Sequence, residues 1–502
     1  MTAAASQRGA PIQSQGGHPA ATGNGVAERL AAALPPGERG DFPITSLDRL
    51  GVPVVAADHA GPPRSGSFGY GDTIEQARTG AYGELVEALL LNRHLRRFTA
   101  RRASYRELRA EGAVDPRELV LPAGTVVDDD QPRDWLPALR WRTGETAWLP
   151  AEFCASSAAD LPRQEPAERL ITVITNGSGA GDTAERAVSH GLLELLQRDG
   201  NGTAFRALDR GVEIDLGPGD GAVRDPVTRA VLARLRAAGV DVLPKLASTQ
   251  FGMVDVHVVG IDADPDAEPL AVTACGEACH PDRETALRKA LLEYAAARSR
   301  KVFAHGPIAR LRPHAPRGYW ARELAAPVPP QEPRALRAMR EWSRCSAAEL
   351  VALLEPTVLS RRSRVAFTDL PTVAPGSLDD PVDLLADLLE RLVAFDVLVV
   401  LAPGDGAVSA KVVVPGLEVE TMSYGRVGSR GVVALLDRDD GLVGAGRPPR
   451  PGAEPVVLTE RGRAELGGDA WFDRRLADRI VGPLYPLYRE PSRHALARTS
   501  GG

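Results

Sequence analysis

GDTAERAVSHGLLELLQ at residues 181–197 and GDTIEQARTGAYGELVE at residues 71–87 align without a gap. A third copy, ETALRKALLEYAAA, occupies residues 284–297. Each copy has a glutamate, an alanine two positions later and a second glutamate seven positions after the alanine. The second glutamates are Glu84, Glu194 and Glu293. Self-similarity of this kind predicts three copies of one supersecondary unit, each built on a helix.

Residues before each copy predict where the helices begin. Thr73, Thr183 and Asp282 stand at the N-cap position, where their side chains can accept hydrogen bonds from the first helical turn. Elsewhere apolar strand-like runs alternate with helical patterns. These runs are 170–175 (LITVIT), 256–262 (VHVVGID), 397–402 (VLVVLA) and 411–414 (KVVV). The alternation predicts an α/β (α+β) fold with helices packed on β-sheets and an internal repeat of Glu-bearing helices.

Composition along the chain predicts three regions. Residues 1–40 are rich in Ala, Gly, Gln, Ser and Pro without periodicity, which predicts a disordered N-terminal tail. The main domain is expected over residues 41–435. It has a break near residues 325–333, where AAPVPPQEP is too rich in proline to continue a helix. Residues 436–502 are expected to form a C-terminal extension.

The second glutamates are candidates for chemistry because of their places on the helices. At about 100° per residue the second Glu lies opposite the first, and a residue three positions further returns to its face. Glu84 therefore shares a face with Glu87, and Glu194 with Gln197. Apolar or small neighbours place each second Glu beside the buried stripe. A solvated surface position is the alternative, because Glu is rarely buried without a partner.

If the three helices converge, four carboxylates come together: Glu84, Glu87, Glu194 and Glu293. Such a carboxylate cluster repels itself unless cations neutralise it. Mg²⁺ carrying a nucleotide suits it, because Mg²⁺ prefers hard oxygen ligands and commonly accompanies phosphate. The segment NGSGAGDT at residues 176–183 can present backbone N–H groups to an anion, or serve as a plain strand-to-helix turn. The chain has no P-loop GxxxxGK[ST].

Composition argues against several classes of protein. The 502 residues carry 60 basic and 66 acidic side chains with no long Lys or Arg run, so nucleic acid is not an expected partner. No apolar stretch reaches the roughly 18 residues that cross a bilayer, and no signal peptide is evident, so a cytoplasmic protein without membrane association is expected. Cys275, Cys279 and His280 are close in sequence, but a buried thiol explains them better than a metal site does.

Five ordered segments resemble the YcaO family. NGSGAGDTAERAVSHGLLELLQRD at 176–199 resembles its central motif, GYGDTIEQARTGAYGELVEA at 69–88 its first, and ETALRKALLEYAAARSR at 284–300 its third. LDRLGVPV at 47–54 and VVVPGLEVETMSYGRVGSR at 412–430 agree in order with further family features. The resemblance covers about residues 41–435.

The resemblance implies a YcaO-type fold that holds ATP between helices through Mg²⁺ and carboxylates. The four clustered glutamates, Glu84, Glu87, Glu194 and Glu293, would be Mg²⁺ ligands. With them, the implied nucleotide-binding residues are Asp182, Gln197, Arg198, Arg298 and Arg426. In such enzymes a nucleophile attacks a peptide amide carbonyl, and ATP phosphorylates the resulting oxyanion so that it can leave.

The family's chemistry is the formation of an azoline, a thioamide or an amidine. The resemblance therefore implies an ATP-dependent peptide cyclodehydratase or thioamide-forming enzyme in the biosynthesis of a ribosomally synthesised, post-translationally modified peptide (RiPP). Its substrate would be a precursor peptide. A separate leader-binding or TfuA-like partner protein and a homodimer are further expectations.

Several positions depart from the family pattern. Gln197 replaces the second Glu of the central motif, and Asp182, Arg186 and Tyr70 also differ from the usual residues. Gly80, Ala88 and Ala296 are three further departures. Gln197 cannot neutralise a cation, so fewer charges remain for Mg²⁺. The proline-rich tail linked to azoline formation is absent from the C-terminal residues. These differences favour a second hypothesis, a degenerate YcaO protein that binds a peptide or a partner without catalysis.

Overall fold

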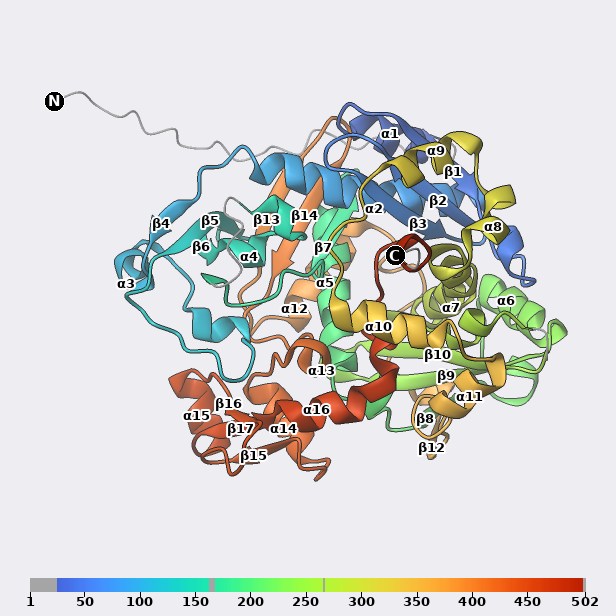
Figure 1. Ribbon diagram of the computed structural model, residues 1–502. Helices are drawn as coiled ribbons and strands as arrows, with labels where there is room; N and C mark the ends of the chain where they lie inside the picture. Colours follow the sequence, from blue (N-terminus) through green and yellow to red (C-terminus); the bar gives the residue numbers. More distant parts are fainter. Residues whose placement is uncertain (1–24, 162–167, 265–266, 500–502) are drawn as a thin grey trace.

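The computed structural model describes residues 25–161, 168–264 and 267–499, and its described strands form four sheets (Figure 1). The first sheet is β1 (Arg39–Pro43), β2 (Val54–His59) and β3 (Ser65–Tyr70). The second is β11 (Gly276–His280), β10 (Val254–Asp262), β9 (Val240–Ser248), β8 (Val212–Asp215) and β12 (Ser363–Ala366). The third is β4 (Arg101–Ala103), β5 (Arg133–Arg140), β13 (Leu398–Pro403), β14 (Val408–Val413) and β7 (Ser178–Gly181), with β6 (Thr146–Pro150) paired to β5. The fourth is β15 (Val443–Ala445), β17 (Ala470–Asp473) and β16 (Ala453–Pro455).

Helices pack on these sheets, as the sequence predicts. The first seven are α1 (Val26–Ala33), α2 (Ile74–Leu95), α3 (Tyr105–Leu108), α4 (Ala151–Cys154), α5 (Ala184–Asn201), α6 (Pro226–Ala237) and α7 (Arg283–His305). Then follow α8 (Ile308–Leu311), α9 (Arg317–Ala325), α10 (Pro333–Trp342), α11 (Ala347–Leu354), α12 (Pro381–Arg391), α13 (Thr421–Tyr424), α14 (Ser429–Leu436), α15 (Glu460–Leu466), α16 (Arg474–Val481) and α17 (Ala495–Thr499). No helix in the described ranges is long and apolar enough to cross a bilayer.

The internal repeat forms three strand–helix units, β3–α2, β7–α5 and β11–α7. All three predicted N-caps are confirmed: Thr73, Thr183 and Asp282 accept hydrogen bonds from backbone N–H groups of their first helical turns. The repeated alanines Ala77, Ala187 and Ala286 are fully buried. In the first two units this small residue lies against a glycine of the strand before the helix, Gly69 or Gly179, and in the third unit Ala290 lies against Gly276 in the same way.

Two predictions about the backbone are wrong. The expected tail of residues 1–40 is folded in part, because the apolar spacing Ala27, Leu30, Ala33 gives α1 a buried face against α2. Residues 1–24 lie outside the described part of the chain. The run 170–175 is not a strand: Lys411 Nζ, 2.8 Å away, donates a hydrogen bond to the carbonyl oxygen of Ile174. Instead, residues 178–181 of the Gly-rich segment form β7, paired with β14.

The close contact between β3 and α2 gives a first prediction. A Cβ added at Gly69 would lie 2.0 Å from the carbonyl oxygen of Ala77, and backbone cannot move aside as a side chain does. Gly69→Ala should therefore lower the free energy of unfolding by about 1–3 kcal/mol in urea denaturation. Gly83→Ala, in α2 with no atom within 4 Å of the new Cβ, is the matched control and should stabilise by roughly 0.5–1 kcal/mol. Equal effects of the two substitutions would contradict the packing argument.

Candidate active site

The second glutamate of each repeat accepts a hydrogen bond from the backbone of the segment before its helix. The N–H of Phe68 donates to Glu84 Oε2 at 3.2 Å, and the N–H of Gly177 donates to Glu194 Oε2 at 2.9 Å. In the third unit the N–H of Glu277 donates to Glu293 Oε2, also at 2.9 Å. We call Glu84, Glu194 and Glu293 the anchoring glutamates. Each uses one carboxylate oxygen to hold its helix against the preceding segment.

The carboxylates of α2 and α5 lie close enough to influence one another. Burial raises the pKa of Glu87 well above its usual range, and the charges of Glu194 and Glu84 raise it further. The side chain of Glu84 is exposed at the surface. Even so, desolvation by the surrounding protein raises its pKa. Lys411 is a cation that interacts with this pair of helices: burial lowers its pKa to about 8, while Glu194 and Glu87 act in the opposite direction.

The third helix joins the same region through shared neighbours. Burial, followed by the charge of Glu277, raises the pKa of Glu293 to about 7. The half-buried Tyr70 interacts electrostatically with both Glu293 and Glu84, and so does Arg300. The structure therefore brings the four predicted carboxylates of the cluster, Glu84, Glu87, Glu194 and Glu293, to one region between α2, α5 and α7.

The donor chemistry of this cluster fits Mg²⁺. Carboxylate oxygens are the ligands that Mg²⁺ prefers, and raised pKa values are expected of acids that face one another without a cation between them. Across residues 25–161, 168–264 and 267–499, however, no three His, Cys, Asp or Glu side chains meet in metal-binding geometry. The carboxylates therefore lie in a common region without forming a metal-binding geometry among the described residues.

Arg198 is the predicted arginine that the structure brings to the cluster. Its Nη2 lies 3.6 Å from Glu194 Oε1, and its Nη1 donates a hydrogen bond to Glu277 Oε2 at 2.8 Å. Burial alone would lower its pKa, but Glu277, Glu194, Glu420 and Glu293 raise it above the usual range. Gln197, beside it on α5, also donates to Glu277, at 3.1 Å. Arg198 therefore lies beside the cluster, whereas the contact of Gln197 is with Glu277.

Sequence reasoning missed Glu277 and Arg300. Glu277 lies in β11 with its side chain only 5% exposed, and the only signal in the sequence was an acid inside the otherwise small and apolar run ACGEAC. Burial would raise its pKa, but Arg206 and Arg198 lower it to about 2. Arg300 lies seven positions after Glu293, which returns it to the same helical face. That spacing could have identified it.

The structure does not bring Arg298 or Asp182 to the cluster. Arg298 lies five positions after Glu293, about 140° around the helix, and pairs with Asp48 at 3.0 Å and Asp262 at 2.7 Å. Asp182 precedes the N-cap of α5, about 18 Å along the helix axis from Glu194, and pairs with Arg186 on the surface.

Arg426 lies away from the anchoring glutamates too. It donates hydrogen bonds to the carbonyl oxygens of Val120 and Leu119, and its guanidinium lies over the ring of Phe153. Burial lowers its pKa to about 10. With Lys411 it lines a small cavity of about 50 Å³. These contacts assign it to holding the loop after Leu119.

The C-terminal segment borders the site, which the sequence did not predict. Arg493 donates to the carbonyl oxygen of Ser67 at 2.7 Å, next to the residue whose N–H binds Glu84. Glu490 lies 3.8 Å from Arg300 and 3.3 Å from Lys301, both on α7. In Figure 1 this dark red segment runs beside α7 and β3. Residues about 400 positions apart therefore meet at the cluster.

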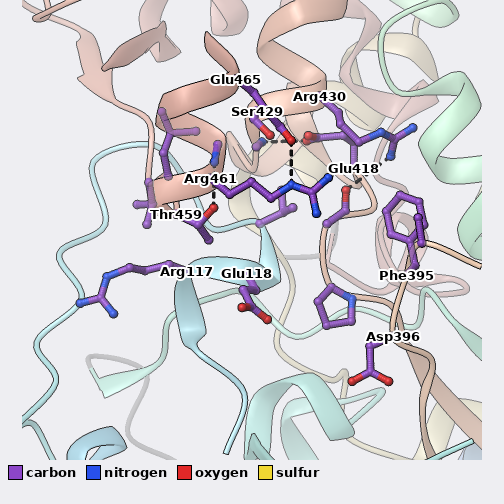
Figure 2. A pocket seen from close by; sticks show the side chains of 18 residues that line it. Arg117, Glu118, Phe395, Asp396, Glu418, Ser429, Arg430, Thr459, Arg461 and Glu465 are labelled. Carbon is purple, nitrogen blue, oxygen red and sulfur yellow. Dashed lines mark hydrogen bonds and ion pairs between the residues drawn. The ribbon is translucent and has the colours of Figure 1, made fainter. Parts of the chain in front are cut away.

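A separate cavity of about 490 Å³ lies between the C-terminal part of the chain and the loop before β13. Figure 2 shows Arg461 and Thr459 on one side, Glu118 opposite them, and Phe395 and Asp396 at the edge. None of the nine predicted nucleotide-site residues lines it. This cavity is therefore distinct from the carboxylate cluster.

Comparison with known proteins identifies the family. The YcaO profile, described as an ATP- and Mg²⁺-binding YcaO cyclodehydratase, matches residues 68–418. The chain belongs to the YcaO family. This confirms the resemblance, and it confirms ATP and Mg²⁺ as the expected cofactors, since the family is defined as binding both.

Individual relatives agree with this assignment. An uncharacterised protein of Methanothermobacter thermautotrophicus is 27% identical over 406 residues, 77% of this chain and 91% of that protein. An uncharacterised protein of Mycobacterium tuberculosis is 27% identical over 269 residues, 53% of this chain and 57% of that protein. Neither relative has a described activity.

Solved structures confirm the fold. A heterocyclase in complex with substrate and cofactor has a TM-score of 0.61 at 19% identity, over 84% of this chain. The match spans 55%, about half, of that heterocyclase. YcaO from Methanopyrus kandleri, bound with AMPPCP and Mg²⁺, has a TM-score of 0.51 at 20% identity, over 80% of this chain and 91% of its own. At these identities the likeness establishes the fold alone.

The raised pKa of Glu293 predicts how stability depends on pH. The folded protein keeps this proton up to about pH 7, whereas the ordinary value is 4.5, so folding binds a proton between these values. The free energy of unfolding should fall as pH rises through this window, by up to about 1.4 kcal/mol per pH unit for this group. Urea denaturation at pH 5, 6 and 7, with metal and nucleotide omitted, measures the slope.

Glu293→Gln isolates that contribution. Its amide oxygen can still accept the N–H of Glu277, but it does not titrate, so the slope should become shallower than that of the wild type. Glu465→Gln, on the exposed face of α15, is the control and should keep the wild-type slope. An unchanged slope in Glu293→Gln would contradict the assignment of a retained proton to this residue.

Proposed function

We propose that the protein is an ATP-dependent enzyme that activates a backbone amide of a precursor peptide, forming an azoline, a thioamide or an amidine in RiPP biosynthesis. One observation carries the proposal: three copies of one strand–helix unit bring four carboxylates and Arg198 to a single region. The anchoring bonds use one oxygen of Glu84, Glu194 and Glu293, and the other oxygen of each carboxylate can bind a ligand. Family membership supplies the reaction class, in which ATP turns an amide oxygen into a leaving group.

The residues of this chain suit the binding steps of that reaction. Glu84, Glu87, Glu194 and Glu293 offer the oxygen ligands that Mg²⁺ prefers. Arg198 and Arg300 offer guanidinium donors, which match phosphate oxygens in geometry and charge. Arg300 is 37% exposed, so a ligand can reach it. The separate partner protein and the homodimer expected from the sequence remain part of this proposal.

Nucleotide binding gives the most direct test. Glu194→Gln keeps an acceptor for the N–H of Gly177 but removes one carboxylate charge. We expect it to weaken binding of ATP-Mg²⁺ by at least about tenfold, measured by calorimetry, as for other losses of metal-site charge. Glu185→Gln, on the same helix but the opposite face, is the matched control and should bind as the wild type does. Equal affinity of Glu194→Gln and wild type would remove Glu194 from the nucleotide site.

Turnover tests the activity itself. Glu84→Gln keeps its acceptor for Phe68 but loses its charge, so ATP hydrolysis that depends on peptide should fall by about 100-fold or more. Phosphate release with a synthetic precursor peptide containing Cys, Ser and Thr is the measurement. Hydrolysis at the wild-type rate in this variant would show that the site lies elsewhere.

A second candidate function is a non-catalytic YcaO scaffold that binds a peptide or partner protein. The observation that favours it is the hydrogen bond from Gln197 to Glu277. The side chain at position 197 binds another protein group there rather than a ligand. The scaffold predicts that ATP-Mg²⁺ does not raise the melting temperature, whereas the enzyme predicts a rise.

A further inference from the structure

Gln197 occupies the repeat position that carries Glu87 in the first unit and Ala296 in the third. No hydrogen bond or ion pair to a described residue is found for the Glu87 side chain. Gln197 instead donates to Glu277 Oε2 at 3.1 Å. A glutamate at position 197 would set two carboxylates at that distance in a largely buried site, which costs free energy. The amide at 197 is therefore explained by the acid at 277.

Glu277 receives four side-chain donors and links two elements beyond its own strand. Oε2 accepts hydrogen bonds from Gln197, from Arg198 at 2.8 Å and from Asn201 at 2.9 Å, all on α5. Oε1 accepts one from Arg206 Nη2 at 2.6 Å, in the short helix Arg206–Leu208. The same residue gives its backbone N–H to Glu293. Its carboxylate thus accepts four hydrogen bonds from side chains of this protein.

Arg206 has a strained backbone conformation, and its guanidinium packs against aromatic rings. Its φ of 58° is in the left-handed region, where a side chain other than glycine is strained. Its guanidinium lies over the rings of Tyr488 and Phe205, at 5.1 and 5.6 Å. Its buried Nε has no hydrogen-bond partner among the described residues, and neither has that of Arg198.

Glu277 lies between two cations, and Glu194, Glu420 and Glu293 also act on Arg198. Two guanidinium groups share one carboxylate, and Glu194, 3.6 Å from Arg198, is itself an anchoring glutamate of the proposed Mg²⁺ site. The side chains of Arg198 and Arg206 are 25% and 15% exposed, so both remain accessible in part. Two partly exposed guanidinium groups that share one carboxylate suit a multiply charged anion.

We propose that Glu277 is a positioning residue that presents Arg198 and Arg206 as a paired binding site for the polyphosphate of the nucleotide. Arg206 and Glu277 thereby complete the site proposed above, on which this inference rests. A glutamate at position 197 could help to hold a metal ion, and that ion would offer positive charge to the phosphates. In this chain, arginine supplies part of that charge instead. In place of an acid at position 197, the site has the ion pair of Glu277 and Arg206, with Glu277 on β11.

Exchange of the two side chains tests the proposal. Tripolyphosphate and ATP-Mg²⁺ are titrated by calorimetry into the full chain and into Glu277→Gln, Gln197→Glu and the double variant. Each single variant should bind tripolyphosphate at least about tenfold more weakly, because it leaves the arginines without their partner or sets two acids together. The double variant restores one acid and one amide, and should bind within about threefold of the wild type.

Controls separate positioning from a loss of folding. Glu213→Gln removes a glutamate that also pairs with two arginines, Arg361 and Arg364, at the far edge of the same sheet. It should leave tripolyphosphate binding unchanged. Melting temperatures accompany each titration. If Glu277→Gln does not fold, Arg206→Lys replaces it: lysine keeps the charge but loses the fork of donors, and tripolyphosphate binding should again weaken about tenfold.

The outcomes distinguish this inference from the proposed function. The inference is overturned if Glu277→Gln or Arg206→Lys binds tripolyphosphate as tightly as the wild type does. It is also overturned if the double variant does not recover binding, or if the wild type does not bind tripolyphosphate. Recovery in the double variant without any peptide-dependent hydrolysis would sustain the anion site and remove the proposed activity. Peptide-dependent hydrolysis that requires Glu84 but not Glu277 would sustain the proposed activity and overturn the anion site.

Discussion

The hydrogen bond from a backbone N–H to the glutamate of the following helix is the interaction on which the site depends. It occurs once in each strand–helix unit, with donor–acceptor distances of 3.2, 2.9 and 2.9 Å. A bond from an amide to a charged acceptor is stronger than one between neutral groups, and it fixes both the position of the helix and the orientation of the carboxylate. Because the three units surround one region, the same bond that builds each unit also gathers acids there.

Gathering acids is costly, and the surrounding chain offsets that cost with cations from distant segments. Lys411 comes from β14, Arg300 from α7 and Arg493 from the C-terminal segment, and all three lower the pKa of at least one clustered glutamate. In the same way, the buried carboxylate of Glu277 forms ion pairs with Arg198 and Arg206. The site is thus a balance of buried charges in which removing one member leaves another unpaired.

The sequence predicted the parts of this arrangement that repeat locally. The three helices, their N-caps Thr73, Thr183 and Asp282 and the shared face of the anchoring glutamates follow from spacing alone, and the family followed from the motifs. Contacts between remote segments did not follow. The family resemblance implies a phosphate contact for Arg298, but this residue pairs with Asp48 and Asp262, which come from other elements. Glu277 was missed because a single acid in a strand has no periodicity, and its four donors come from other elements.

The anchoring bond has a consequence for how such a protein can change over generations. The anchoring bond uses the side chain of the glutamate but not that of the residue three positions later, which is Glu87 in one unit, Gln197 in the next and Ala296 in the last. A mutation at that second position alters the charge offered to a ligand while the helix stays in place. Three copies of one scaffold within a single gene can therefore diverge in chemistry without first losing the architecture, and new reactivity can be tried one copy at a time.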